Sequence, residues 1–279
     1  MGRFDNLHRI AALDPERDQL EIYRLTALHD FPWDVTRALE LALYRTYCVP
    51  SIAALLDETG EFRLRTQKRY DDTVLLMSEI LEQGYDSVAG RAALSRLNRI
   101  HGRFAISNDD FRYVLTTFVV VPVRWLQRYG WRPLHPHEVA ASYAYYREVG
   151  RRMGIKDIPA SYDETAALMD AYEAGHFAAG GPQTRTAVAT RELLVSWLPG
   201  PLAPVVRLGV SALLDDEVRD CFGFPSPPRW LPPVTSAGLR ARARVVRHLP
   251  PRRRPVSAAE SRLVRSYPDG YDVSALGPP

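Results

Sequence analysis

A histidine at the end of an apolar helical stripe is the first residue whose position suggests chemistry. In "RLNRIHGRF" (96–104), His101 lies four residues after Leu97 and seven after Leu94, so the three side chains share one helical face. Glycine follows at once. A lone histidine there most often interacts with the carbonyl end of its helix. The alternative is that the imidazole ligates a group that the chain itself does not supply.

A second group of polar residues, in "QKRYDDT", combines an arginine, a carboxylate and a hydroxyl. Arg69 and Thr73 lie one helical turn apart, and Asp72 lies three residues after Arg69. The simplest interpretation is an ion pair between Arg69 and Asp72 on a solvated face, worth ~0.2–0.5 kcal/mol. However, "VLLMSEIL" follows directly and turns an apolar face inward. Arg69 and Thr73 lie at its edge, where they could donate hydrogen bonds to an anion or an oxygen ligand in a cavity.

The remaining histidines and aromatic residues give weaker signals. His135 and His137 form an H-x-H pair, yet they lie among prolines, where a turn and a helix start are expected. His176 lies near a predicted helix end, and the tyrosines of "ASYAYYREVG" are typical of core packing. Motifs for dinucleotide binding, phosphate-binding loops, zinc proteases and serine hydrolases are absent from the sequence. These residues alone therefore predict no particular reaction.

Helices must position these residues, because nearly every long segment carries helical periodicity and helix-terminating residues. Asp34 is placed as an N-cap, Ser161 and Glu164 form a capping-box pattern, and Pro122 is expected to kink its helix. The strand-like "TTFVVVPV" has helical flanks and contains that proline. We therefore predict an all-α fold. The predicted helices cover residues 34–48, 51–60, 66–84, 86–102, 109–130, 137–154, 165–177, 184–198 and 202–221.

Two regions of different composition divide the chain. Residues 1–225 are predicted to form one helical domain, and residues 226–279 a proline- and arginine-rich extension with one basic helix near 236–248. The two cysteines form no C-x-x-C, which disfavours a disulfide scaffold and suits the cytoplasm. The net charge of +3 is too small to indicate nucleic-acid binding.

The apolar stretches are too short or too interrupted to predict a membrane span. The first residues also lack the continuous apolar core of a signal peptide. We therefore expect a cytoplasmic protein. The hydrophobic hairpin 193–214 and the basic C-terminal tail remain candidates for peripheral contact with a membrane.

An ordered set of segments resembles a known family. The segments are "DFPWD", "QKRYDDT", "RLNRIHG", "ISNDDFRYVLTTFVVVPVRWLQRYGWRPL" and "AASYAYYREVGRRMGIKDIP". Over about residues 25–225 they resemble the catalytic-domain family shared by the ER-bound oxygenase of mycophenolic acid biosynthesis (MpaB) and the bacterial latex-clearing rubber oxygenases. The resemblance is closer to the MpaB-like branch. It implies an all-helical, O₂-using oxidoreductase.

The resemblance also implies a cofactor, haem b, whose iron is held through one axial histidine. His101 takes the matching position, so it would be the metal ligand. The arginines around it would then be available to pair with the haem propionates. These arginines are Arg96, Arg99 and Arg103.

The catalytic residues implied by the resemblance lie in "QKRYDDT". Arg69 and Thr73 match an arginine and a threonine on the distal side of the haem in the rubber oxygenases, where they would stabilise bound oxygen by hydrogen bonding. Asp72 replaces a lysine there, so the local charge changes sign. The family reaction is O₂-dependent cleavage of a carbon–carbon double bond in an isoprenoid, which implies a small lipophilic substrate.

Two alternatives stay open at this point. One is a haem-dependent oxidase or peroxidase-type enzyme that inserts no oxygen, which Asp72 keeps open. The other is a non-catalytic haem-binding or helical interaction protein, whose basic C-terminus would bind a membrane or an acidic partner.

Overall fold

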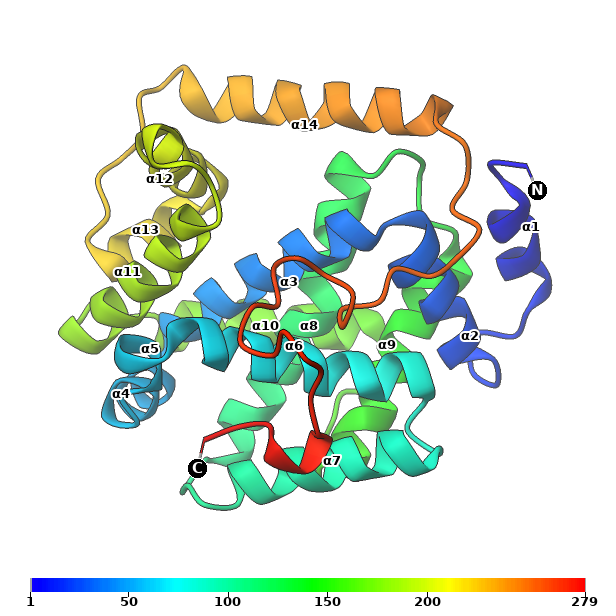
Figure 1. Cartoon of the computed structure of the whole chain (residues 1–279), viewed down its shortest axis with the longest axis horizontal. Coiled ribbons are helices and arrows are strands. Elements are labelled where there is room, and N and C mark those ends of the chain that lie inside the picture. The colour runs from blue at the N-terminus through cyan, green and yellow to red at the C-terminus, as the bar shows by residue number, and fades with distance from the viewer. Residues whose placement is uncertain (1, 279) are drawn as a thin grey trace.

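Helices make up all the regular secondary structure of residues 2–278, the part of the chain that the computed structural model describes (Figure 1). The prediction of an all-α fold is confirmed. The elements are α1 (Asp5–Ala12), α2 (Gln19–Arg24), the π-helix η1 (Leu25–Asp30), α3 (Pro32–Tyr47), α4 (Pro50–Glu58), α5 (Glu61–Leu64), α6 (Thr66–Gln83), α7 (Val88–His101), α8 (Asn108–Tyr129), α9 (Pro136–Arg152), α10 (Tyr162–His176), α11 (Gly181–Ser196), the 3-10 helix η2 (Gly200–Leu202), α12 (Ala203–Leu213), α13 (Asp216–Phe222), α14 (Leu231–His248) and the 3-10 helix η3 (Val273–Ala275).

The predicted helices between residues 34 and 198 are present, with ends shifted by a few residues. The Ser161 cap is confirmed, because its hydroxyl accepts from the Glu164 N–H at 3.1 Å. The single helix 202–221 is wrong, since the backbone at Leu214 is extended and separates α12 from α13. Asp34 is not an N-cap. α3 begins two residues earlier, and the buried carboxylate of Asp34 instead accepts from the Trp125 indole at 3.2 Å.

α8 is the central element of the core and packs against α3, α9 and α10. Its β-branched run, which includes Val119, Val120 and Val123, is buried. Such residues favour strands by propensity, so burial of the apolar side chains, at roughly 25 cal/mol per Å², must stabilise this helix. Pro122 lies inside α8, which the structure continues from Asn108 to Tyr129.

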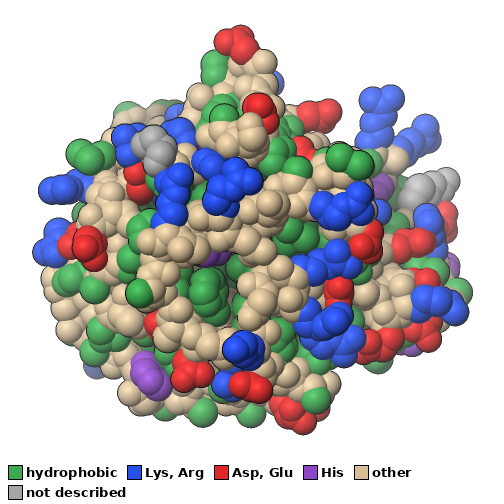
Figure 2. Space-filling view, turned by 90° about the horizontal axis from the view of Figure 1, so that it is seen from below, with side chains coloured by type: hydrophobic (Ala, Val, Ile, Leu, Met, Phe, Trp, Pro, Cys, Tyr) green, Lys and Arg blue, Asp and Glu red, His purple; other side chains and the backbone are tan. Residues whose placement is uncertain are grey.

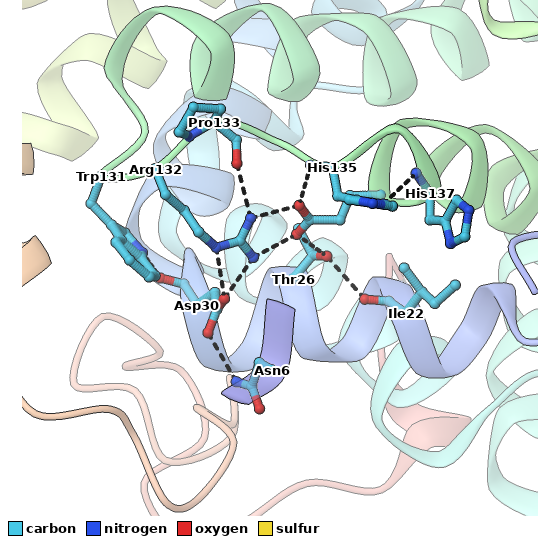
Figure 3. A network of polar contacts seen from close by, with 10 residues as sticks. Asn6, Ile22, Thr26, Asp30, Trp131, Arg132, Pro133, His135 and His137 are labelled. Atoms are coloured by element: carbon cyan, nitrogen blue, oxygen red, sulfur yellow. Dashed lines mark hydrogen bonds and ion pairs between the residues drawn. The ribbon is translucent and has the colours of Figure 1, made fainter. Parts of the chain in front are cut away.

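A buried cluster of charged groups joins the N-terminal helices, which the sequence pattern did not predict, to the start of α9 (Figure 3). Arg132 donates to Asp30 Oδ2 at 2.6 Å and to Glu138 Oε2 at 2.6 Å. Asn6 Nδ2 donates to the second oxygen of Asp30 at 2.9 Å, and Thr26 Oγ1 donates to Glu138 Oε1 at 2.8 Å. Each buried charge is thus paired and hydrogen-bonded, which is the condition for such a cluster to be stable.

The H-x-H pair belongs to the start of α9 and not to a metal site. The His135 N–H donates to Glu138 Oε2 at 2.7 Å, and the His137 N–H donates to His135 Nδ1 at 3.1 Å (Figure 3). These bonds form a capping box, so the helix-start interpretation is confirmed. Within residues 2–278, no group of three or more His, Cys, Asp or Glu side chains could hold a metal ion.

The C-terminal segment packs against the predicted helical domain. α14 contacts α8 and α12, and residues 249–278 then cross α6 and end on α7 (Figure 1). The N–H groups of Arg265 and Ser266 donate to Asp71 Oδ2 at 3.0 and 2.8 Å. Leu276 is fully buried. The segment after α14 is therefore irregular but forms part of the body of the molecule.

No single helix among residues 2–278 is long and apolar enough to cross a membrane. The helices α3 and α4 reach the required length and composition only together, and they meet at an angle of 98°. A shorter apolar stretch runs from Gly200 to Leu213.

The buried cluster predicts a large effect of removing the cation that bonds to both of its carboxylates. Arg132→Met would leave Asp30 and Glu138 buried without their direct ion pairs and lower the free energy of unfolding by about 3–5 kcal/mol, measured by urea denaturation. Arg124→Met is the control. It breaks an exposed pair with Asp170 (2.7 Å) and should cost less than about 1 kcal/mol. Equal losses in the two variants would contradict this account.

Candidate functional site

The helical hairpin of α6 and α7 brings His101 opposite Arg69. The two helices are joined by residues 84–87 and run antiparallel, so the end of α7 lies beside the start of α6 (Figure 1). Gly84 has a φ of +86°, and a Cβ on Gly90 would lie 2.0 Å from the Gly84 carbonyl oxygen. Both positions therefore require glycine. The backbone of α7 at Gly90 approaches the end of α6 at Gly84 closely, and this contact helps to set how His101 faces α6.

His101 is a largely buried imidazole without a hydrogen bond at Nδ1. Nδ1 has no partner in the described part of the chain, and the ring packs edge-on against Phe111 with centroids 5.4 Å apart. Burial, with the positive charge of Arg69 as a smaller cause, lowers the pKa of His101 to about 4. The ring is therefore neutral at physiological pH, which is the form that ligates metals.

Arg69 and Thr73 form one hydrogen-bonded unit on α6. Arg69 Nη1 donates to Thr73 Oγ1, and that hydroxyl donates to the Arg69 carbonyl oxygen at 3.0 Å. Burial lowers the pKa of Arg69, although a guanidinium stays protonated at neutral pH. The guanidinium also lies 5.6 Å from the centroid of the Phe62 ring. Within residues 2–278 Arg69 forms no ion pair with a carboxylate, which makes the burial of its charge costly.

Asp72 points to the C-terminal segment. Its carboxylate lies 2.8 Å from Lys68 Nζ and accepts a hydrogen bond from the Tyr267 hydroxyl. The surface ion pair between Arg69 and Asp72 that the sequence suggested is therefore wrong. The negative charge of Asp72 therefore contributes to the contact with the C-terminal segment. Asp72 does not line the cavity described next.

A cavity of about 230 Å³ lies between α3, α6, α11 and the C-terminal segment. Arg69 and Thr73 contribute polar atoms to its wall, and most of the remaining wall is apolar. The face in Figure 2 is hollowed, with hydrophobic side chains inside the hollow and a histidine at its edge. Apolar residues that line the cavity include Leu39, Leu43, Val74, Met77, Phe118, Leu193, Leu194 and Val264.

Glu40 is a cavity residue that the sequence reasoning missed. Its buried carboxylate lies 2.7 Å from Arg37 Nη2 and accepts from the Tyr70 hydroxyl at 2.9 Å. Burial raises the pKa of Glu40 to about 7, against the opposing effects of Arg37 and Tyr70. A usable signal was present, because Thr36, Glu40 and Leu43 follow at helical spacing and all line the cavity.

The three arginines predicted to pair with haem propionates lie along the end of α7. Arg96 Nε donates to the Leu276 carbonyl oxygen at 2.5 Å. Arg103 Nη1 lies 3.4 Å from the Pro278 carbonyl oxygen, and Arg99 is exposed. Two of the three thus contact the C-terminal segment, and their role toward propionates stays a prediction.

The site combines three kinds of group. His101 does not line the apolar cavity, but it lies close enough to Arg69 for that charge to lower its pKa, and it offers one neutral nitrogen lone pair to a metal centre. Thr73 Oγ1 accepts from Arg69 and holds it at the cavity wall, where the remaining guanidinium N–H groups can donate to an anion or to a polar oxygen. Glu40 offers a carboxyl that exchanges a proton near neutral pH. These groups suit redox or oxygen chemistry on a lipophilic molecule.

Comparison with known proteins identifies the family. Residues 33–248 match the family described as "ER-bound oxygenase mpaB/B'/Rubber oxygenase, catalytic domain". The chain belongs to this oxygenase family, as the resemblance in its sequence implied. The matched residues include those of the candidate site on α3, α6 and α7, and they end where α14 ends. The C-terminal segment that covers α6 lies outside the match.

Three fungal relatives are similar to this chain. The ER-bound oxygenase mpaB' of Penicillium brevicompactum is 28% identical over 261 residues, which cover 87% of this chain and 61% of that protein. The ER-bound oxygenase mpaB of Penicillium roqueforti (strain FM164) is 27% identical over 222 residues, which cover 73% of this chain and 74% of that protein. The ER-bound oxygenase mpaB of Penicillium brevicompactum is 32% identical over 132 residues, which cover 45% of this chain and 34% of that protein. The chain thus spans less than two thirds of the first of these relatives.

The raised pKa of Glu40 predicts how stability depends on pH. The folded protein holds this proton up to about pH 7, whereas the unfolded chain releases it near pH 4.5. The free energy of unfolding should therefore fall by up to about 3 kcal/mol as the pH rises between these values. In Glu40→Gln this fall should be absent, as measured by urea denaturation at several pH values.

Glu192→Gln serves as the control for this measurement. Arg207 lowers the pKa of that exposed carboxyl, so its replacement should leave the fall in place. An unchanged pH profile in Glu40→Gln would contradict the assignment of the raised pKa to this residue.

Proposed function

We propose that this chain is a haem b-dependent oxygenase that uses O₂ to oxidise a small, lipophilic, isoprenoid-like substrate. The observation that carries the proposal is the neutral, partly buried His101, whose buried Nδ1 has no hydrogen-bond partner within residues 2–278. A polar atom buried without a partner is costly unless a water or a ligand bonds to it. Membership of an oxygenase family supports the reaction class.

His101 would be the axial ligand of the haem. Its imidazole would hold the iron from the end of α7, while Phe111 fixes the orientation of the ring from α8. Haem, when bound, would supply the electron transfer to O₂ that no amino-acid side chain provides. The mainly apolar wall of the cavity that Arg69 lines would exclude water from a bound substrate.

Arg69 would supply the donors on the substrate side, and Thr73 would hold its guanidinium in place. Their mutual hydrogen bond fixes both groups before a substrate enters. Preorganised donors in a dry site stabilise negative charge that develops on a reacting oxygen, typically by several kcal/mol. Glu40, whose pKa is raised to about 7, would accept or return a proton at its carboxylate while Tyr70 keeps its orientation.

The composition of the cavity supports a lipophilic substrate. Leucine, valine and methionine side chains from four segments form most of its wall, and only a few polar groups interrupt them. Asp72 supported the alternative of oxidation without oxygen insertion. Since its carboxylate is bound by Lys68 and Tyr267 outside the cavity, no observation now favours that alternative over oxygenation.

Replacement of the proposed ligand tests haem binding. His101→Ala should lose at least about tenfold in haem affinity, read from the Soret band of the purified protein titrated with haem. The matched control is His176→Ala, because His176 also ends a helix but bonds to the Tyr172 carbonyl at 2.9 Å. Equal haem uptake by the wild type and His101→Ala would overturn the ligand assignment.

Isotope labelling tests the reaction class. With ¹⁸O₂ and a prenylated substrate that the protein consumes, an oxygenase yields labelled product, and unlabelled product would exclude oxygen insertion. Thr73→Val should lower kcat by roughly tenfold or more while haem stoichiometry stays the same. Thr73→Ser keeps the hydroxyl and should retain most of the rate.

A further inference from the structure

We infer that η2, α12 and α14 form a docking face for an anionic lipid membrane. This face is called the α12–α14 face below. It lies away from His101 and Arg69, and the inference stands whether or not the protein binds haem. Three observations carry it: exposed apolar side chains, exposed arginines without carboxylate partners, and the pattern of small apolar residues along α14.

Large apolar side chains gather where α12 meets the start of α14. The two helices pack against each other at one end of the molecule (Figure 1). Val205 is 65% exposed, Trp230 61% and Val234 57%. Leu202 and Leu208 are also exposed. A soluble surface tolerates single exposed apolar residues, whereas a group of this size with a tryptophan among them is typical of an interaction site.

Arginines on α14 and in the segments directly before and after it add positive charge to this region. Between Asp220 and Glu260 the chain has eight arginines and no acidic residue. Arg242 pairs with Asp34 at 3.1 Å. The other seven are exposed, and none pairs with a carboxylate in residues 2–278. They are Arg229, Arg240, Arg244, Arg247, Arg252, Arg253 and Arg254.

α14 presents both features on its outer face. Its inner face, with Ala243 buried and Leu239 and Val246 half-buried, packs against the core. Residues that repeat every three or four positions from Val234 to Val245 lie on the outer face of α14. They are small or apolar and exposed, and exposed arginines lie beside them. A helix with apolar residues and arginines together on its outer face suits the boundary between lipid headgroups and acyl chains.

A lipid surface fits this face better than a nucleic acid does. Arginines alone would serve either partner, because both are rows of phosphate groups. The exposed valines, leucines and tryptophan would gain nothing at a duplex backbone but would enter the acyl boundary of a bilayer. The cavity wall also includes Leu193 and Leu194 on α11, the helix that leads into η2, so a docked molecule would hold its cavity near the lipid.

Co-sedimentation of the full chain with vesicles tests the inference. The wild type should sediment with vesicles of equal parts phosphatidylglycerol and phosphatidylcholine, and much less with phosphatidylcholine alone. Arg240→Gln and Arg244→Gln should each lower the partition coefficient roughly fivefold. Val205→Ser and Trp230→Ser together should lower it by roughly tenfold or more.

Matched controls come from the start of α7, on the opposite side of the molecule from α14 (Figure 1). Val88 is 79% exposed and Arg91 is exposed. Val88→Ser and Arg91→Gln should leave vesicle binding unchanged, and all variants should keep the circular dichroism of the wild type. His101→Ala should also bind vesicles as the wild type does, which separates this test from the proposed haem chemistry.

Three outcomes would overturn the inference. The first is failure of the wild type to sediment with anionic vesicles. The second is an equal loss in the α7 controls, which would mean that charge anywhere on the surface is enough. The third is binding to a DNA or RNA duplex, in the absence of vesicles, with an affinity that Val205→Ser and Trp230→Ser leave unchanged. That result would assign the arginines to a nucleic acid.

Discussion

The central constraint of this structure is that the partly buried guanidinium of Arg69 acts on the partly buried imidazole of His101, while neither forms an ion pair with a carboxylate within residues 2–278. Two positive charges cannot share such a region, because burial and mutual repulsion both penalise the charged forms. Arginine keeps its proton under nearly all conditions, so the histidine must be the neutral group. Arg69 therefore remains a cation while His101 keeps a free nitrogen lone pair, and the proposed chemistry depends on this combination.

The remainder of the fold holds α6 in the orientation that this pair requires. Residues on one face of α6 bind the C-terminal segment, through Asp71 to backbone N–H groups and through Lys68 to a carbonyl oxygen. Arg69 and Thr73 then lie on the other face, toward the cavity. The C-terminal segment lies outside the residues that match the family, yet it lines part of the cavity. The cavity wall is therefore not formed by the matched residues alone.

Helices and site residues were predictable to different extents. Periodicity and capping residues predict most helices, because an amphipathic helix that packs on a core must show its pattern in the sequence. The end-of-helix position of His101 followed from the same pattern. The contact between Asp72 and Tyr267 could not be predicted, because the two residues are 195 positions apart and no local sequence pattern indicates such a contact. Glu40 shares a helical spacing with Thr36 and Leu43, which marks its face of the helix, but that spacing does not reveal the raised pKa, because the groups that bury the carboxyl come from several helices.

The most direct test of the central constraint is an NMR titration of the His101 imidazole in the haem-free protein. The account predicts a pKa of about 4 in the wild type. In Arg69→Met the pKa should rise only in part toward 6.5, because burial is the larger cause and stays in place. A His101 pKa near 6.5 in the wild type would contradict the account, since the imidazole would then be an ordinary solvated histidine at a helix end.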